Sequence, residues 1–191
     1  IVVCNGDEVA EIVFATTSEN DIAYSWSIDT EIGTQSLTGV GNIPLFEAEN
    51  IGTDPVVATV TVTPSNDETD PSLTCEGSSI EFTITVNPTA QVDPVDSLDL
   101  CNGDTAVVDF TTSNGGVDSV TTYSWEITGG DSVFVGGALS DVGNINLPVI
   151  NETNADLVAT VTVTPTYTND GVDCTGPSEE FTITVSPTAQ V

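Results

Sequence analysis

The chain has 191 residues and carries 30 acidic side chains but no lysine, arginine or histidine, so its formal net charge is −30 at pH 7. Without Lys or Arg there is no cationic surface for phosphate groups, which excludes nucleic-acid binding, a P-loop and attachment to anionic lipid. Without His there is no Ser-His or Cys-His nucleophile pair, and without Lys no Schiff base, so we predict that the chain is not an enzyme.

What remains is rich in β-branched side chains. The chain has 30 Thr and 26 Val residues, and these types suit half-buried pleated strands better than helices. The hydrophobic share of 38% is close to that of a globular protein. No apolar run approaches the roughly 18 residues that a membrane-spanning helix needs, so we expect no membrane insertion. The composition predicts a folded all-β protein.

Apolar and polar side chains alternate with a period of two along the predicted strands. Val60 and Val62 face one way, and Thr59, Thr61 and Thr63 face the other. One packed face and one wetted face are typical of antiparallel sheets in a sandwich. In chain order, the expected strands are residues 1–3, 9–16, 22–29, 34–38, 43–47, 56–63 and 79–87. Seven strands of this spacing predict an immunoglobulin-like sandwich.

The same series of strands returns in the second half of the chain. Cys-Asn-Gly-Asp occurs at 4–7 and at 101–104, and residues 58–64 are identical to residues 159–165. Internal repeats of this length indicate tandem domains. We therefore predict repeat 1 at 1–92, a linker at 93–97 and repeat 2 at 98–191. Each repeat has a Trp on its third strand, Trp26 and Trp125, for which core packing is the preferred interpretation over an exposed ligand platform.

Four cysteines occupy equivalent places in the two repeats. Cys4 and Cys75 are 71 residues apart, and Cys101 and Cys174 are 73 apart. The economical assignment of the three possible pairings is one disulfide within each repeat, Cys4–Cys75 and Cys101–Cys174. Free buried thiols are the alternative. Oxidised cysteines would place the protein outside the cytosol.

The repeats resemble a known family in several stretches. These are Cys4-Asn-Gly and Cys101-Asn-Gly, Gly143-Asn-Ile, residues 159–165, Cys174-Thr-Gly-Pro and the segment from Phe181 to Val191. They are similar to the PKD-like, or Ig-like, tandem repeats of very large secreted and cell-surface proteins of Bacteroidetes, including SprB-like gliding-motility adhesins. The lack of Lys and Arg departs from the usual composition of that family.

This resemblance implies an extracellular or cell-surface location after export by type IX secretion. The implied function is a stalk or spacer in a surface adhesin or filament, used in attachment or gliding. The implied partners are neighbouring repeats of the same array, identical chains in a filament, an extracellular surface or polysaccharide, and the secretion machinery. The alternative function is a carbohydrate-binding or spacer domain of a secreted polysaccharide-degrading enzyme.

Carboxylates are the only charged side chains that could bind a metal, which favours Ca²⁺ or Mg²⁺. A calcium ion at the predicted linker would stiffen it, but solvated linker charge is the preferred alternative because no EF-hand pattern occurs. A second acidic group, Asp67, Glu68 and Asp70, is better explained as a solvated turn. The calcium candidates are Asp93, Asp96, Asp99 and Asp118.

Two kinds of glycosylation motif occur. Asn151-Glu-Thr153 is an N-linked acceptor sequence. The resemblance also points to the Bacteroidetes O-linked motif, in which Asp precedes Ser or Thr and then a small or apolar residue. That motif places candidate sites at Ser97, Thr105, Ser119 and Ser132.

Overall fold

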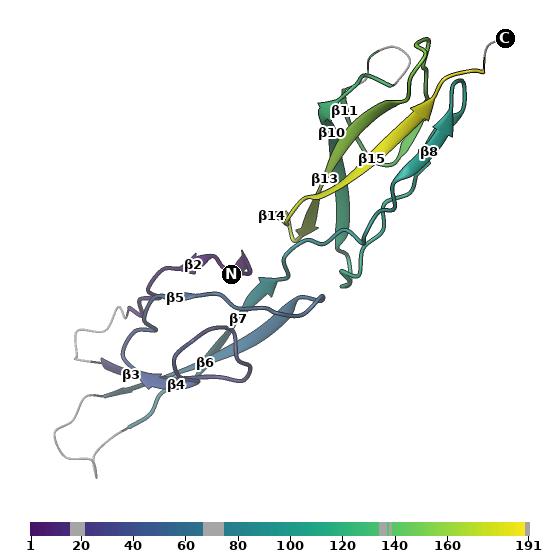
Figure 1. Ribbon diagram of the computed structural model, residues 1–191. Coiled ribbons are helices and arrows are strands. Elements are labelled where there is room, and N and C mark those ends of the chain that lie inside the picture. Colours follow the sequence, from purple (N-terminus) through teal and green to yellow (C-terminus); the bar gives the residue numbers. More distant parts are fainter. Residues whose placement is uncertain (16–21, 67–74, 134–136, 138, 190–191) are drawn as a thin grey trace. The chain divides into compact units, whose positions relative to one another are not determined.

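The computed structural model describes residues 1–15, 22–66, 75–133, 137 and 139–189. Its contacts divide the chain into two compact units, Ile1–Thr89 and Ala90–Val191 (Figure 1). Every helix or strand in these described ranges is a β-strand. The prediction of an all-β, immunoglobulin-like fold is thereby confirmed.

The first unit has one five-stranded sheet and one two-stranded sheet. The larger sheet has the strand order β1-β7-β6-β3-β4, and the smaller one pairs β2 with β5. An isolated bridge between Ile12 and Ile43 extends the smaller sheet. The strands are β1 (Val2–Cys4), β2 (Glu8–Val9), β3 (Ile22–Ile28), β4 (Thr38–Val40), β5 (Phe46–Glu47), β6 (Val56–Asn66) and β7 (Ile80–Asn87).

The second unit repeats this plan with longer strands. Its larger sheet has the order β11-β10-β13-β15-β8, with β14 also paired to β13, and its smaller sheet pairs β12 with β9. The strands are β8 (Leu98–Cys101), β9 (Thr105–Val108), β10 (Val120–Gly130), β11 (Ser140–Val142), β12 (Ile145–Pro148), β13 (Leu157–Asn169), β14 (Val172–Thr175) and β15 (Glu179–Ser186).

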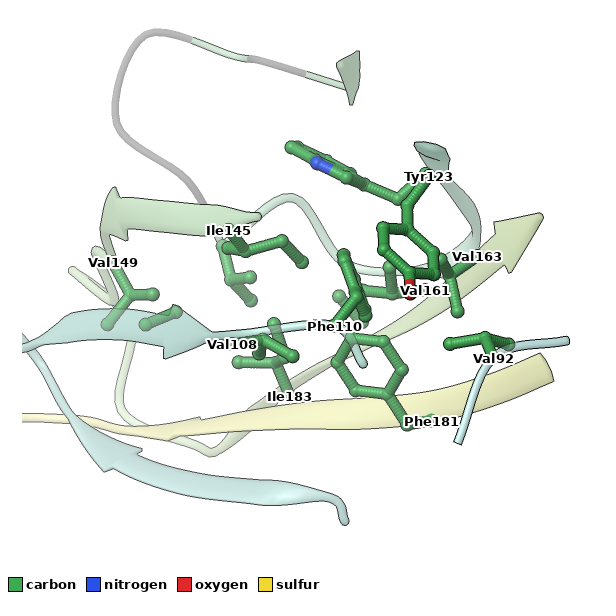
Figure 2. Close-up of a cluster of buried hydrophobic side chains, with 14 of the residues drawn as sticks. Val92, Val108, Phe110, Tyr123, Ile145, Val149, Val161, Val163, Phe181 and Ile183 are labelled. Carbon is green, nitrogen blue, oxygen red and sulfur yellow. The ribbon is translucent and has the colours of Figure 1, made fainter. Parts of the chain in front are cut away.

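The period-two alternation puts the expected side chains into both cores. On β6, Val60 and Val62 are buried and the intervening threonines are not. The two tryptophans are also buried, with 7% of Trp26 and 3% of Trp125 exposed, so their core interpretation is confirmed. Figure 2 shows the second core. The centroid of the Phe110 ring lies 5.5 Å from the centroid of the Tyr123 ring and 6.3 Å from that of the Phe181 ring.

The first strand of each unit runs parallel to the last strand. On β1, Val2 pairs with Thr85 and Cys4 with Asn87, and β8 pairs with β15 in the same sense. All the other strand pairs among the described residues are antiparallel. The parallel direction of β1 and β8 determines at which end of the sheet Cys4 and Cys101 lie.

The segment predicted to be a linker packs into the second unit. Val92 is part of the second core, and Val95 packs against it. The Asp93 N–H donates to the Thr111 carbonyl at 2.8 Å, and the Thr182 N–H donates to Ser97 Oγ at 3.2 Å. Val92 and Val95 therefore anchor this segment to the second core, and the bond to Ser97 ties its end to β15.

One predicted strand of the first unit is displaced. Residues 34–38 were expected to be extended, but β4 occupies Thr38–Val40 instead. The preceding chain turns into the core, because Ile32 is fully buried and Gly33 has a φ of 94°. A side chain at Gly33 would collide with the Glu47 carbonyl oxygen. Ile32 therefore fills the core from a loop, and the tight turn at Gly33 lets the chain enter the core there.

Candidate functional site

The Cys-Asn-Gly-Asp segment forms a hydrogen-bonded turn at the end of β1. The Asp7 side chain accepts the Cys4 N–H at 2.9 Å, and the Asp7 N–H donates to the Cys4 carbonyl at 3.1 Å. The Gly6 N–H reaches the Ala48 carbonyl at 2.7 Å with a φ of 87°, a conformation that favours glycine. These bonds fix the backbone around Cys4.

Two asparagines and a threonine tie this turn to the end of β7. The Asn5 side chain accepts the Asn50 N–H at 2.8 Å and donates to Thr89 Oγ1 at 2.9 Å. Asn50 Nδ2 donates to the Val86 carbonyl at 2.8 Å and to the Asp54 carbonyl at 2.9 Å. Buried amides that satisfy buried carbonyls hold such a turn rigid.

The second unit contains the same network. The Asp104 side chain accepts the Cys101 N–H at 2.8 Å, and Asn102 accepts the Asn151 N–H at 2.8 Å and donates to Thr188 Oγ1 at 3.0 Å. Asn151 Nδ2 donates to the Val185 and Ala155 carbonyls at 2.6 and 2.8 Å. Asn50 and Asn151 are structural residues that alternation along the strands does not reveal, although their matching places in the two repeats are a usable signal.

This network rules out N-linked glycosylation of the folded protein at Asn151. The side chain of Asn151 is 2% exposed, and both hydrogen atoms of its Nδ2 are donated to backbone carbonyls. A glycan would have to form on that same nitrogen. The Asn151-Glu-Thr153 sequence is therefore a structural motif, in which Thr153 donates to the Asn151 side chain at 2.7 Å.

The cysteines of each unit lie at opposite ends of its larger sheet. We call the end at which β7 or β15 finishes the exit end, and the opposite end the leading end. Cys4 pairs with Asn87 and Cys101 with Ser186, which places both at exit ends. The Cys75 carbonyl accepts the Asn66 N–H, and Cys174 pairs with Tyr167, which places both at leading ends.

The separation of the two ends is too large for a disulfide within a unit. On β6, Val56 pairs with Val86 beside the exit end, and Asn66 lies 10 residues further along, beside Cys75. Ten residues of extended strand span about 33 Å, whereas the Cα atoms of a disulfide lie within about 7 Å. On β13, Leu157 and Tyr167 have the same 10-residue spacing. The predicted pairings Cys4–Cys75 and Cys101–Cys174 are therefore wrong.

One cysteine of each unit is nevertheless in disulfide form. Cys4 and Cys174 are disulfide-bonded. Cys75 and Cys101 carry exposed thiols, and Cys174 is 2% exposed. Disulfides persist in oxidising compartments, so this observation fits a location outside the cytosol.

The predicted calcium ligands do not gather into a site. Asp93 accepts a hydrogen bond from Thr111 Oγ1 at 2.7 Å, Asp99 lies opposite Thr184 in the sheet, and Asp118 stands in a turn with a φ of 60°. No three acidic or cysteine side chains come together to hold a metal anywhere in the described part of the chain. Asp96 is exposed, and Asp67, Glu68 and Asp70 of the second acidic group lie outside the described residues.

Of the four candidate O-glycosylation sites, two have engaged hydroxyl groups. Ser97 Oγ accepts hydrogen bonds from the N–H and the hydroxyl of Thr182, and Ser119 Oγ donates to the carbonyls of Gly115 and Gly116. Thr105 and Ser132 are exposed. These two positions are the more accessible to a modifying enzyme and remain predictions.

Two ionisable groups have shifted pKa values. The Thr59 N–H donates to the Asp29 carboxylate at 2.8 Å, and this bond lowers the pKa of Asp29 below its ordinary value of 3.8. Burial raises the pKa of Tyr123 above its ordinary value, and the negative charge of Asp93 adds to the effect. The hydrogen bond from Thr59 and the burial of the Tyr123 ring account for these two shifts.

A hollow in the first unit offers two buried polar atoms. It is lined by Trp26, Thr34, Ile43, Leu45 and Phe46, among others. Trp26 Nε1 and Thr34 Oγ1 are buried, and neither has a hydrogen-bond partner among the described residues. Their side chains are 7% and 8% exposed, so a small polar group that entered the hollow could bind both. No sequence pattern indicates this feature.

No protein-family model matches the chain, and no curated protein sequence matches it. No helix in the described residues is long and apolar enough to cross a membrane. The arguments about function therefore rest on the two units themselves.

Proposed function

We propose that this chain is a structural repeat module that acts as a stalk or spacer in an extracellular surface adhesin or filament. The observation that carries the proposal is the path of the chain through the second unit. It enters at the leading end, where Ala90 lies so close to Gly176 that a side chain there would collide with the Ala90 carbonyl. It leaves β15 at the exit end, beside Cys101.

A repeat that is entered at one end and left at the other adds its own length to an array. The two ends are about 33 Å apart along the strands. Residues 88–92 and 187–191 both read Pro-Thr-Ala-Gln-Val, so the second repeat closes with the sequence that joins the first repeat to it. A repeat can therefore be appended after Val191 through the same joining sequence.

The surface composition supports a spacer over a ligand-binding module. Among the described residues, the large apolar side chains that are exposed are all aliphatic. Polysaccharide recognition commonly uses exposed aromatic rings, and here both tryptophans are core residues. The lack of Lys and Arg also leaves no cleavage site for trypsin-like proteases, a useful property outside the cell.

Location and partners form part of the same proposal. The disulfide form of Cys4 and Cys174 supports an oxidising environment. We place the module at the cell surface, with neighbouring repeats as its immediate partners, type IX secretion as its export route, and an extracellular surface or polysaccharide as the target of the whole protein.

The proposal is tested with a three-repeat protein in which residues 93–191 are appended after Val191. The join reproduces the natural Val92–Asp93 junction, because residues 88–92 and 187–191 are identical. Small-angle scattering should show a maximum dimension that exceeds that of the 191-residue chain by about 30–40 Å. An unchanged dimension would contradict the spacer proposal. Antibodies against the chain should also label intact cells that make it.

Polysaccharide binding is a second candidate because of the hollow beside Trp26. Oligosaccharides that occupy it would change the fluorescence of Trp26, and Thr34→Val should weaken that change by removing one of the two buried polar atoms. A Trp26→Phe variant, which leaves only Trp125, serves as the control. No fluorescence response to a panel of oligosaccharides would leave the hollow as a packing feature.

A further inference from the structure

Cys101 and Cys4 occupy the same turn in two different chemical states. In each turn the cysteine N–H donates to the Asp three residues later, and the following Asn N–H donates to the last residue of the parallel strand, at 2.9 Å in both units. Yet Cys4 is disulfide-bonded, whereas Cys101 carries an exposed thiol.

The position of Cys101 excludes a disulfide partner in its own unit. The other cysteine of the second unit, Cys174, lies at the leading end, about 33 Å away along β13. It is already disulfide-bonded. A partner for Cys101 must therefore come from outside the second unit.

We propose that Cys101 is a covalent joining site, which forms a disulfide with the leading-end cysteine of a repeat that follows. This inference rests on the proposed function, because it requires such a repeat. The two disulfide-bonded cysteines of the chain are one of each kind, Cys4 at an exit end and Cys174 at a leading end. The partner is thus the counterpart of Cys174 in the next repeat.

The turn prepares Cys101 for this bond. Its backbone is held on both sides, by the bonds to Asp104 and by the register with Ser186, while its side chain stays exposed. Little conformational entropy is then lost when the bond forms. The exit end is also where the chain leaves the repeat, so a following repeat begins close to this thiol.

The reaction is thiol–disulfide exchange with a disulfide oxidant, either a protein or a small molecule. The Cys101 thiolate attacks one sulfur of the oxidant and releases one thiol, which leaves a mixed disulfide on Cys101. The leading-end cysteine of the next repeat then attacks the Cys101 sulfur and releases the second thiol. Two protein thiols are oxidised and one disulfide of the oxidant is reduced.

The test uses the three-repeat protein described above, refolded with oxidised glutathione and then labelled with iodoacetamide under denaturing, non-reducing conditions. It has six cysteines, the four of the chain plus the appended copies of Cys101 and Cys174. If Cys101 bonds to the appended copy of Cys174, intact-mass measurement should show two labels. Four labels would overturn the proposal.

Replacement of Cys101 changes the number of iodoacetamide labels in opposite directions, depending on whether Cys101 is bonded to the appended repeat or free. In the three-repeat protein with Cys101→Ser, the proposal predicts three labels, one more than the parent, because the appended leading-end cysteine loses its partner. A parent with four labels would fall to three instead. Cys75→Ser is the matched control, since it replaces another exposed thiol and should lower the count by one in either case.

A second measurement needs no appended repeat. Cys75→Ser and Cys101→Ser forms of the 191-residue chain are mixed at millimolar concentration with oxidised glutathione. Random pairing would make half of all disulfide-linked dimers mixed, with one chain of each variant. A larger share of mixed dimers supports pairing of an exit-end with a leading-end cysteine, and a share of half or less contradicts it. Scattering from the three-repeat protein separates the two proposals, because a longer particle with a free Cys101 thiol refutes this inference and leaves the spacer proposal standing.

Discussion

At the exit ends of the two units the same side chains make the same contacts. Asn5, Asn50 and Thr89 in the first unit correspond to Asn102, Asn151 and Thr188 in the second, with matching hydrogen bonds. At the leading ends the counterparts differ. The second unit has Tyr167, which is 1% exposed and donates to the Gly115 carbonyl at 2.9 Å, where the first unit has the half-buried Asn66.

This difference indicates which end of a repeat is under the tighter constraint. The exit end must present a cysteine from a fixed turn, and the same network does so in both units. At the leading end of the second unit, β14 pairs with β13, and in the described residues of the first unit the corresponding pairing is the isolated bridge between Ser65 and Glu76.

Replacement of Tyr167 by Ala should destabilise the second unit by about 3–5 kcal/mol, because it empties a fully buried aromatic site. The counterpart change, Asn66→Ala, should cost only about 0.5–1.5 kcal/mol, since it removes one hydrogen bond to the Cys75 N–H at a partly exposed position. Denaturant unfolding checks both, with Trp125 as the reporter of the second unit in a Trp26→Phe background and Trp26 as the reporter of the first unit in a Trp125→Phe background. Equal costs would show that the leading ends are equivalent after all.

At the exit ends, Asn50→Ala and Asn151→Ala should destabilise their units by similar amounts, about 2–4 kcal/mol each, because each leaves two backbone carbonyls without donors. Asn154→Ala, at an exposed position of the same loop as Asn151, is the control and should have little effect. If the losses of unfolding free energy in the two variants differ by more than about 2 kcal/mol, the exit ends are not equivalent.

Salt should stabilise both units, because a chain with a net charge of −30 repels itself and dissolved ions screen that repulsion. A gain of about 1 kcal/mol would raise the melting temperature of each unit by about 4–8 °C between low and moderate NaCl concentration. Calcium chloride at the same ionic strength should give the same shift. A larger shift with calcium would support the predicted calcium binding that the arrangement of Asp93, Asp96, Asp99 and Asp118 does not favour.

The smallest expected effect is the pH dependence due to Asp29. Its folded-state pKa is lowered by the Thr59 N–H, so its contribution to stability is fully present above its ordinary value of 3.8 and is lost as the pH falls through the lower folded-state value. Asp29→Asn should therefore flatten the acid limb of the stability curve below about pH 4. Urea unfolding of the parent chain and of the Asp29→Asn variant at pH 7 and pH 3 measures this difference.

The cysteines show where sequence reasoning fails. Their matched spacings predicted one disulfide in each repeat, which would have been possible if the first and last strands were antiparallel. Parallel pairing of β1 with β7 instead places Cys4 beside the finish of β7, while Cys75 precedes its start. The sequence contains no direct record of that strand direction, so it could not assign the bond.

The asparagine network was missed for a related reason. Asn50 and Asn151 stand in polar loop sequences, where Asn is ordinarily a solvated turn residue. Only the packing of those loops over β7 and β15 brings the Val86 and Val185 carbonyls within reach of the side-chain amides.

By itself, the sequence determined the fold class, the repetition of the strand series and the core positions of the tryptophans and alternate valines. These properties follow from local chemistry, because the period of two and the β-branched residues leave few other structures open. The tertiary structure decided the ends of the repeats: which cysteines meet, which asparagines are buried, and that residues 92–97 pack against the second unit. Those properties depend on strand direction and on contacts between residues far apart in the chain, which alternation along a single strand does not encode.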